Sequence, residues 1–123
     1  MNFSYETPPL GTVRDWLDFR AKDGGTAFFF TDGGAPLTWN DLRTGAIEIA
    51  QALTTHGIAK GESVAILQPN GREGVLAFYG AVYGGFRATM VNLAAGRDAI
   101  AYALEHSEAR IALVHDSVNE MYQ

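Results

Sequence analysis

The stretch GESVAIL, residues 61–67, decides the fold of this chain. Its apolar residues do not alternate with polar ones, so both faces of the expected strand at 63–67 are covered, as in a parallel sheet. Two more short apolar segments follow, at 88–91 and 110–114. Helical stretches separate the three segments. The pattern therefore predicts an α/β fold in which consecutive βαβ units build one parallel βαβαβ sheet flanked by helices.

The helix before the first strand is marked at both ends. Thr38 and Asp41 have the spacing of a capping box, and an apolar stripe runs from there to Leu53. Gly57 is placed for the left-handed residue that ends a helix, with Ile58 touching Leu53 as in a Schellman motif. We expect a helix that stops just before Gly57.

The helix after that strand is unusually apolar. Asn70 and Glu73 have a capping spacing, and the helix should run to about Gly84. Residues 75–83 are apolar nearly all round, and three short strands offer such a helix few partners. We expect this helix and part of the sheet to lack partners within the chain, which would make the chain a homo-oligomer. A short helix should follow at 97–106.

A helix and a hairpin should precede the βαβ units. Residues 1–11 contain two adjacent prolines and predict an irregular lead-in. Thr12 begins a capping-box pattern, and Gly24-Gly25 should end the helix. The hairpin is expected at 26–37, away from the centre of the sheet, because Pro36 cannot donate to a strand ladder.

Composition excludes several classes of protein. The chain has 123 residues, 47% of them hydrophobic, a net charge of −5 and no cysteine. This size fits one domain, and the missing cysteines exclude disulfide scaffolds and thiolate metal sites. The negative balance argues against a nucleic-acid or anionic-membrane surface. There is no run long enough to span a membrane and no secretion signal at the start, so a cytoplasmic protein is expected.

Phosphate-binding signals are weak. Gly71 and Gly74 could form half of a phosphate loop, but a turn and a helix start is the favoured interpretation, since neither GxGxxG nor a Walker motif is present. Lys22 and Lys60 fall in turns. The seven arginines fall about one per element, with no loop to gather them. We expect no phosphate cluster in this chain.

Histidine and aromatic residues also have structural interpretations. His56 and His106 fall near expected helix ends, where imidazole suits the helix dipole, and no spacing predicts a metal site. His115 and Asp116 follow the last strand, where parallel sheets place ligands. The three phenylalanines at 28–30 are expected in the hairpin core rather than on a stacking platform, because basic neighbours are lacking.

Four pieces of sequence carry a family resemblance. They are LTWNDL at 37–42, HGIAKGESVAI at 56–66, PN at 69–70 with FYGAVYGG at 78–85, and VN at 91–92 with AYAL at 101–104 and HSEAR at 106–110. In this order they resemble the N-terminal part of the adenylate-forming superfamily, the AMP-binding enzymes that include acyl-CoA synthetases. The resemblance covers residues 12–116.

The resemblance implies a ligase that uses ATP and magnesium to activate a carboxylic acid as an acyl-adenylate and passes it to coenzyme A, as in fatty acid metabolism. Residues 12–123 would be the N-terminal part of an AMP-binding domain, ending before the family's phosphate loop, with the remainder of the parent chain as partner. No catalytic residue is implied here, and the piece alone should be inactive and bind none of these cofactors. In some relatives a basic residue after the asparagine matching Asn92 lies close to the CoA nucleotide; Arg97 is the candidate, though it could simply begin a helix.

A different class of protein stays open. The chain could be a stand-alone small α/β binding or signalling module without catalysis. A receiver domain needs several acidic residues at strand ends, whereas the strand ends here are Gln68, Asn92 and His115-Asp116. A nucleotide-binding half-Rossmann domain is disfavoured by the missing glycine motif. The gene sequence beyond codon 123 would distinguish a ligase from such a module.

Overall fold

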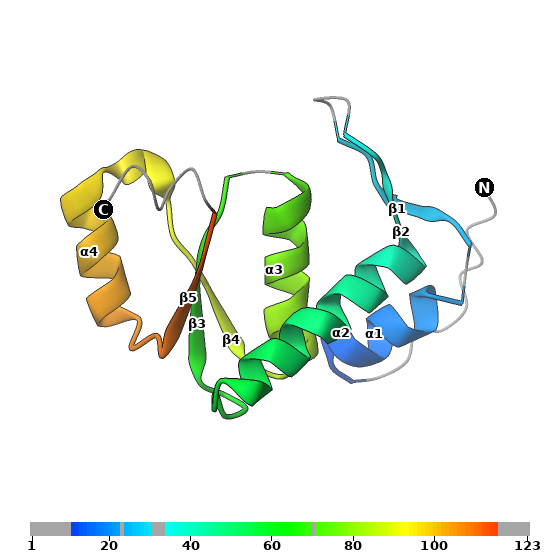
Figure 1. The fold of residues 1–123 in the computed structure, drawn as a ribbon, viewed down its shortest axis with the longest axis horizontal. Coiled ribbons are helices and arrows are strands. Elements are labelled where there is room, and N and C mark those ends of the chain that lie inside the picture. Colours follow the sequence, from blue (N-terminus) through cyan, green and yellow to red (C-terminus); the bar gives the residue numbers. More distant parts are fainter. Residues whose placement is uncertain (1–10, 23, 31–33, 70, 116–123) are drawn as a thin grey trace.

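The computed structural model describes residues 11–22, 24–30, 34–69 and 71–115 (Figure 1). Two sheets and a set of flanking helices make up this part of the chain. The elements in order are α1 (Val13–Arg20), β1 (Thr26–Phe28), β2 (Leu37–Thr38), α2 (Trp39–Thr55), β3 (Ser63–Leu67), α3 (Arg72–Tyr83), β4 (Arg87–Met90), the 3₁₀ turn η1 (Leu93–Ala95), α4 (Arg97–His106) and β5 (Ile111–Val114).

The larger sheet has the order β4-β3-β5, and both of its strand pairs are parallel. β3 is central, and all five of its residues are buried. Figure 1 shows α3 and α4 on opposite faces of this sheet, and β1 and β2 form a separate antiparallel hairpin. The predicted α/β fold is confirmed, including the single parallel sheet and the separate hairpin.

α2 begins and ends as its sequence predicts. The Thr38 hydroxyl accepts a hydrogen bond from the Asp41 amide at 3.0 Å, which closes the capping box. Gly57 has φ of 85°, and the Ile58 amide donates to the Leu53 carbonyl at 3.1 Å. Leu53 and Ile58 are both buried in the core beneath β3. This is the predicted Schellman ending, and it turns the chain toward β3.

α3 ends with a second Schellman motif, which was not predicted from the sequence. Gly85 has φ of 85°, and the Phe86 amide donates to the Ala81 carbonyl at 3.0 Å. The two turns meet, because the Gly61 amide donates to the Gly85 carbonyl at 2.9 Å. β3 and β4 therefore start side by side, and the two helix endings fix their register.

The start of α3 differs from the prediction, and so does its environment. Gly71 takes the N-cap and offers no side-chain cap; Asn70 lies outside the described residues. A Cβ on Gly74 would lie 2.8 Å from the Pro69 carbonyl oxygen, so only glycine fits there. α3 has partners within the chain, because the sheet packs on one side and α2 with α1 on the other. The expectation of an unpartnered helix is wrong, since α2 crosses it closely.

The N-terminal elements are shorter than predicted. α1 ends at Arg20 rather than at the glycines 24–25, and the Ala21 amide closes its last turn by donating to the Leu17 carbonyl at 2.9 Å. The expected lead-in falls almost wholly outside the described residues. Phe28 and Phe30 pack in the core with α2 and α3, as predicted for the hairpin, whereas Phe29 is 79% exposed. Successive side chains of an extended chain point to opposite sides, so the middle ring, that of Phe29, faces solvent.

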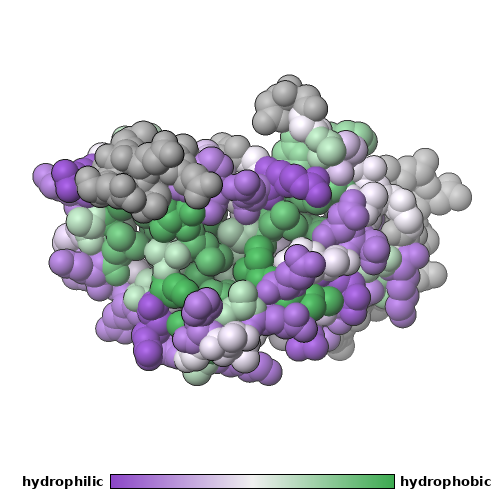
Figure 2. Space-filling view, viewed as in Figure 1, coloured by the Kyte–Doolittle hydropathy of each residue, from purple (hydrophilic) through white to green (hydrophobic). Residues whose placement is uncertain are grey.

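Among the described residues, β5 is covered on one face only, although its sequence does not alternate. Ile111 and Leu113 pack under α3, whereas Ala112 and Val114 are exposed on the other face. The core beneath α4 draws its strand residues from β3 and from Val91, which follows β4, so α4 leaves β5 bare. Figure 2 shows apolar surface between α4 and α3, where the sheet lies in Figure 1.

Candidate functional site

The carboxyl edge of the sheet carries the predicted cofactor residue. After β4, the Asn92 side chain accepts from the Ala94 amide at 3.0 Å and bends the chain into η1. Gly96, with φ of 93°, then starts α4, and Arg97 is its first residue. Arg97 is exposed at the edge where parallel sheets bind ligands. The turn therefore presents a cation to solvent at that edge.

The start of α3 lies at the same edge but carries an acid. The Glu73 carboxylate pairs with the His115 imidazole at 3.1 Å, which links the first turn of α3 to the residue after β5. A carboxylate there competes with any other anion for the positive end of the helix. Together with the close approach of Gly74 to Pro69, this favours the turn and helix start over a phosphate loop.

The cation and phosphate sites of an ATP-dependent ligase need donors that the described residues do not group. Within the described ranges, no set of three His, Asp or Glu side chains comes together as a metal site would require. His56 caps the end of α2, and His106 ends α4 against the ring of Tyr102, with centroids 4.1 Å apart. The described part of the chain therefore groups no set of side-chain ligands for Mg²⁺.

A hollow at the opposite end of the sheet gathers basic side chains. It lies between α1, the part of α2 from Arg43 onward and the end of α3, and its volume is about 610 Å³. Arg14 of α1, Arg43 of α2 and Lys60 of the turn before β3 line it, and none of the described residues that line it is a carboxylate. Its apolar part comes from Ile47, Ala50 and Tyr83. We call this the basic hollow.

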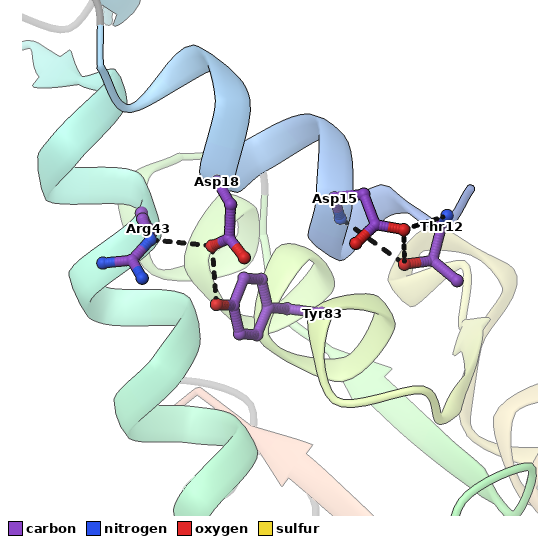
Figure 3. Close-up of polar contacts among 5 residues, drawn as sticks. All are labelled: Thr12, Asp15, Asp18, Arg43 and Tyr83. Atoms are coloured by element: carbon purple, nitrogen blue, oxygen red, sulfur yellow. Dashed lines mark hydrogen bonds and ion pairs between the residues drawn. The ribbon is translucent and has the colours of Figure 1, made fainter. Parts of the chain in front are cut away.

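Asp18 holds the elements around the basic hollow together (Figure 3). Its Oδ1 accepts from the Arg43 Nε and from the Tyr83 hydroxyl, both at 2.7 Å. The Arg14 guanidinium lies over the Tyr83 ring, 5.1 Å from its centroid. One carboxylate of α1 thus fixes one side chain of α2 and one of α3.

This network shifts the pKa values of its members. Burial alone would raise the pKa of Asp18, but the hydrogen bonds from Tyr83 and Arg43 and the charges of Arg43 and Arg14 outweigh it, so the pKa lies below its ordinary value. Burial raises the pKa of Tyr83, and the bond to the Asp18 carboxylate raises it further. Asp18 therefore stays ionised and Tyr83 stays protonated at neutral pH.

The basic hollow was not predicted from the sequence. Lys60 was expected in a turn and the arginines about one per element, whereas Lys60 and two of the arginines line one surface. A signal was present in α2, where positions 43, 47, 50, 51 and 54 follow the helical period beside the buried stripe. Arg14 and Asp18 are also one turn apart. Because α1, α2 and the turn that contains Lys60 lie far apart in the sequence, the pattern of each did not show that their side chains line one hollow.

The fold defines a class: a parallel α/β unit with two capped helix–strand turns, preceded by a helix and a hairpin. The chain belongs to the family of AMP-binding enzymes, which matches residues 17–122. The predicted family is confirmed.

Individual relatives share part of this chain. The long-chain-fatty-acid–CoA ligase of Bacillus subtilis is 28% identical over 83 residues, which are 68% of this chain and 15% of that protein. The long-chain-fatty-acid–AMP ligase FadD26 of Mycobacterium marinum is 43% identical over 78 residues, 63% of this chain and 12% of that protein. The chain thus spans 12–15% of the length of these relatives.

Solved structures agree on the fold. The anthranilate CoA ligase AuaEII, solved with anthranoyl-AMP, superposes with a TM-score of 0.78 at 28% identity, over 98% of this chain and 23% of that one. The nonribosomal peptide synthetase FmoA3 superposes with a TM-score of 0.84 at 23% identity, over 96% of this chain and 13% of that one.

The described part of this chain contains no helix long and apolar enough to cross a membrane.

Proposed function

We propose that the chain is the N-terminal structural part of an AMP-dependent ligase, with residues 12–123 belonging to its AMP-binding domain. The ligase would activate a carboxylic acid as the acyl-adenylate and transfer it to coenzyme A. The family match over residues 17–122 carries this proposal. The chain covers a small share of each relative, and the remainder of a parent chain would be its partner.

The chemistry would belong to that remainder. An adenylating site must stabilise negative charge on the transferring phosphorus with backbone amides, cations and a metal ion. The described residues bring no metal-ligand cluster together, and the start of α3 holds the Glu73 carboxylate where a phosphate would bind. ATP and Mg²⁺ would bind elsewhere in the ligase, and this chain alone would make no adenylate.

Coenzyme A is the proposed acceptor, and Arg97 the proposed contact for one of its phosphates. Support comes from its place at the carboxyl edge, exposed at the start of α4. The curated relatives named above favour a long-chain fatty acid as the acid. A second candidate, transfer to a thiol other than CoA, is favoured by the 43% identity to a fatty-acid–AMP ligase.

One assay tests this function. ATP–pyrophosphate exchange that depends on added fatty acid is measured on this chain and on the product of the gene extended beyond codon 123. We expect exchange by the longer protein, thioester formation with CoA, and no exchange by the chain alone. Exchange by the chain alone would overturn its structural role. A gene that stops at codon 123 would favour a stand-alone binding module instead.

A further inference from the structure

We propose that the basic hollow binds a small organic phosphate. The site is formed by Arg14, Arg43 and Lys60 around the apolar floor of Ile47, Ala50 and Tyr83. It is separate from the proposed CoA contact: Lys60 precedes β3 and Tyr83 precedes β4, so the hollow lies at the amino end of the sheet, whereas Arg97 follows β4 at the carboxyl end.

The charge of the hollow selects an anion. Three of the nine lysines and arginines line it, in a chain whose net charge is −5. Asp18 offsets one positive charge by its bond to Arg43. Within the described residues, neither Arg14 nor Lys60 forms an ion pair, so about two positive charges face the hollow uncompensated. This matches the charge of a phosphate monoester dianion.

The arginines are held in place before any ligand arrives. Arg43 donates its Nε to Asp18, and this leaves the terminal amino groups of the guanidinium for a phosphate. Arg14 is kept over the hollow by the Tyr83 ring. Little side-chain entropy remains to be lost at these two residues on binding, which favours a defined site over diffuse attraction.

The floor of the hollow selects an organic group beside the phosphate. Tyr83 and Ala50 are buried and form a packed floor, and the half-buried Ile47 beside them supplies most of the apolar surface within reach of the cations. The volume of about 610 Å³ falls in the range of small-molecule sites, roughly 300–1,000 Å³. An inorganic anion would leave that floor in water, whereas a ring or short chain would cover it.

The test is a titration of this chain with phenyl phosphate, followed by amide NMR shifts, with inorganic phosphate and phenol as comparison ligands. We expect amide shifts at the end of α2, in the turn that contains Lys60 and at residues 83–84. Phenyl phosphate should bind more tightly than either comparison ligand. Lys60→Gln and Arg14→Gln should each weaken binding about tenfold, the scale of a lost hydrogen bond to a charged group. Lys22→Gln is the matched control and should bind as wild type.

Three outcomes would overturn the proposal. They are no saturable binding at millimolar phenyl phosphate, equal weakening by Lys22→Gln, and, when vesicles with and without phosphatidic acid replace the soluble ligands, binding only to the vesicles that contain it. The last would assign the basic hollow to a lipid headgroup instead of a free molecule. Lys60 and Arg14 are both exposed, so their replacement should leave the core intact and each variant folded. The melting temperature of each variant measures this.

Discussion

Asp18 is the side chain on which the packing of α1 depends most. Its carboxylate is the partner of both Arg43 and Tyr83, at 2.7 Å each, and it is only partly shielded, with 38% of the side chain exposed. A hydrogen-bonded carboxylate at such a depth stabilises the fold modestly, since solvent weakens the charge interaction. Asp18 also orients the side chains of Arg43 and Tyr83 toward the basic hollow.

The first prediction concerns Asp18→Asn. We expect a loss of about 1 kcal/mol in the free energy of unfolding at neutral pH, because two hydrogen bonds to a charge become bonds to a neutral amide. The folded pKa lies below the ordinary 3.8, so this contribution is complete above that value and disappears as the pH falls through the lower folded pKa. Urea unfolding at neutral and acidic pH measures it: the gap between wild type and variant should shrink in acid.

A matched substitution separates this effect from general charge. Glu48→Gln removes a carboxylate from an exposed position of α2 and should change stability little at either pH. An equal loss in both variants, or a gap that widens in acid, would contradict the assigned network.

The second prediction concerns Arg97→Gln in the extended ligase. We expect the KM for CoA to rise several-fold, about 1 kcal/mol for one exposed charge-assisted contact, with fatty-acid-dependent ATP–pyrophosphate exchange unchanged. Steady-state thioester formation and the exchange assay give the two readouts. Arg72→Gln is the control, because Arg72 donates to the Ala35 carbonyl at 3.2 Å and should leave the KM for CoA alone. An unchanged KM for CoA in Arg97→Gln would contradict a contact between Arg97 and CoA, and Arg97 would then serve only as the first residue of α4.

At the scale of elements, local signals predicted most of the boundaries. Thr38, Gly57 and the apolar β3 each specify their structure through nearest neighbours, so the sequence was sufficient for α2, β3 and the turn between them. Two sequence motifs also meet in space: Glu62 pairs with Arg110 at 2.8 Å and joins the turn before β3 to the start of β5.

Contacts between distant segments could not be predicted in the same way. The bare face of β5 depends on where α4 lies, and the basic hollow depends on how α1 crosses α2 and α3. Neither arrangement can be predicted from the residue pattern of a single helix or strand. The partners of α3 were missed for the same reason, since the apolar residues of α2 and of α3 were each visible but their pairing was not.

The third prediction tests the α2–α3 crossing. A Cβ on Gly80 would lie 2.5 Å from the Ile49 Cβ, an atom that cannot move without its helix. We expect Gly80→Ala to destabilise the fold by about 1–2 kcal/mol, because overpacking outweighs the better helix propensity of alanine. Chemical denaturation gives the value.

Gly45→Ala is the matched control at the same crossing. Its Cβ would meet the Leu76 Cδ2 at 2.6 Å, the end of a side chain that can rotate away, so the loss should be clearly smaller. A larger loss at position 45 than at position 80 would mean that the two helices cross differently from the structure described.

At the scale of the whole molecule, the helices cover the sheet unevenly. α3 has the sheet on one side and α2 with α1 on the other, whereas α4 lies over β3 and β4 and leaves β5 uncovered. Within the described residues, β4 and β5 each pair on one side only, so the sheet has two open edges. Open edges with apolar neighbours are where sheets recruit further strands. In the proposed ligase, the remainder of the parent chain would supply them.

The last prediction is that the isolated chain self-associates through β5. Val114 is 37% exposed beside the exposed Ala112, and covering apolar surface yields about 25 cal/mol per Å². A second copy can cover this face when no parent chain does, which gives a homo-oligomer. Val114→Lys should shift the chain toward the monomer in sedimentation velocity at rising concentration, because a charge on an edge strand opposes pairing. Ala52→Lys, on the exposed side of α2, should associate as wild type. A wild-type chain that stays monomeric at every concentration would show that the uncovered face of β5 is stable in water.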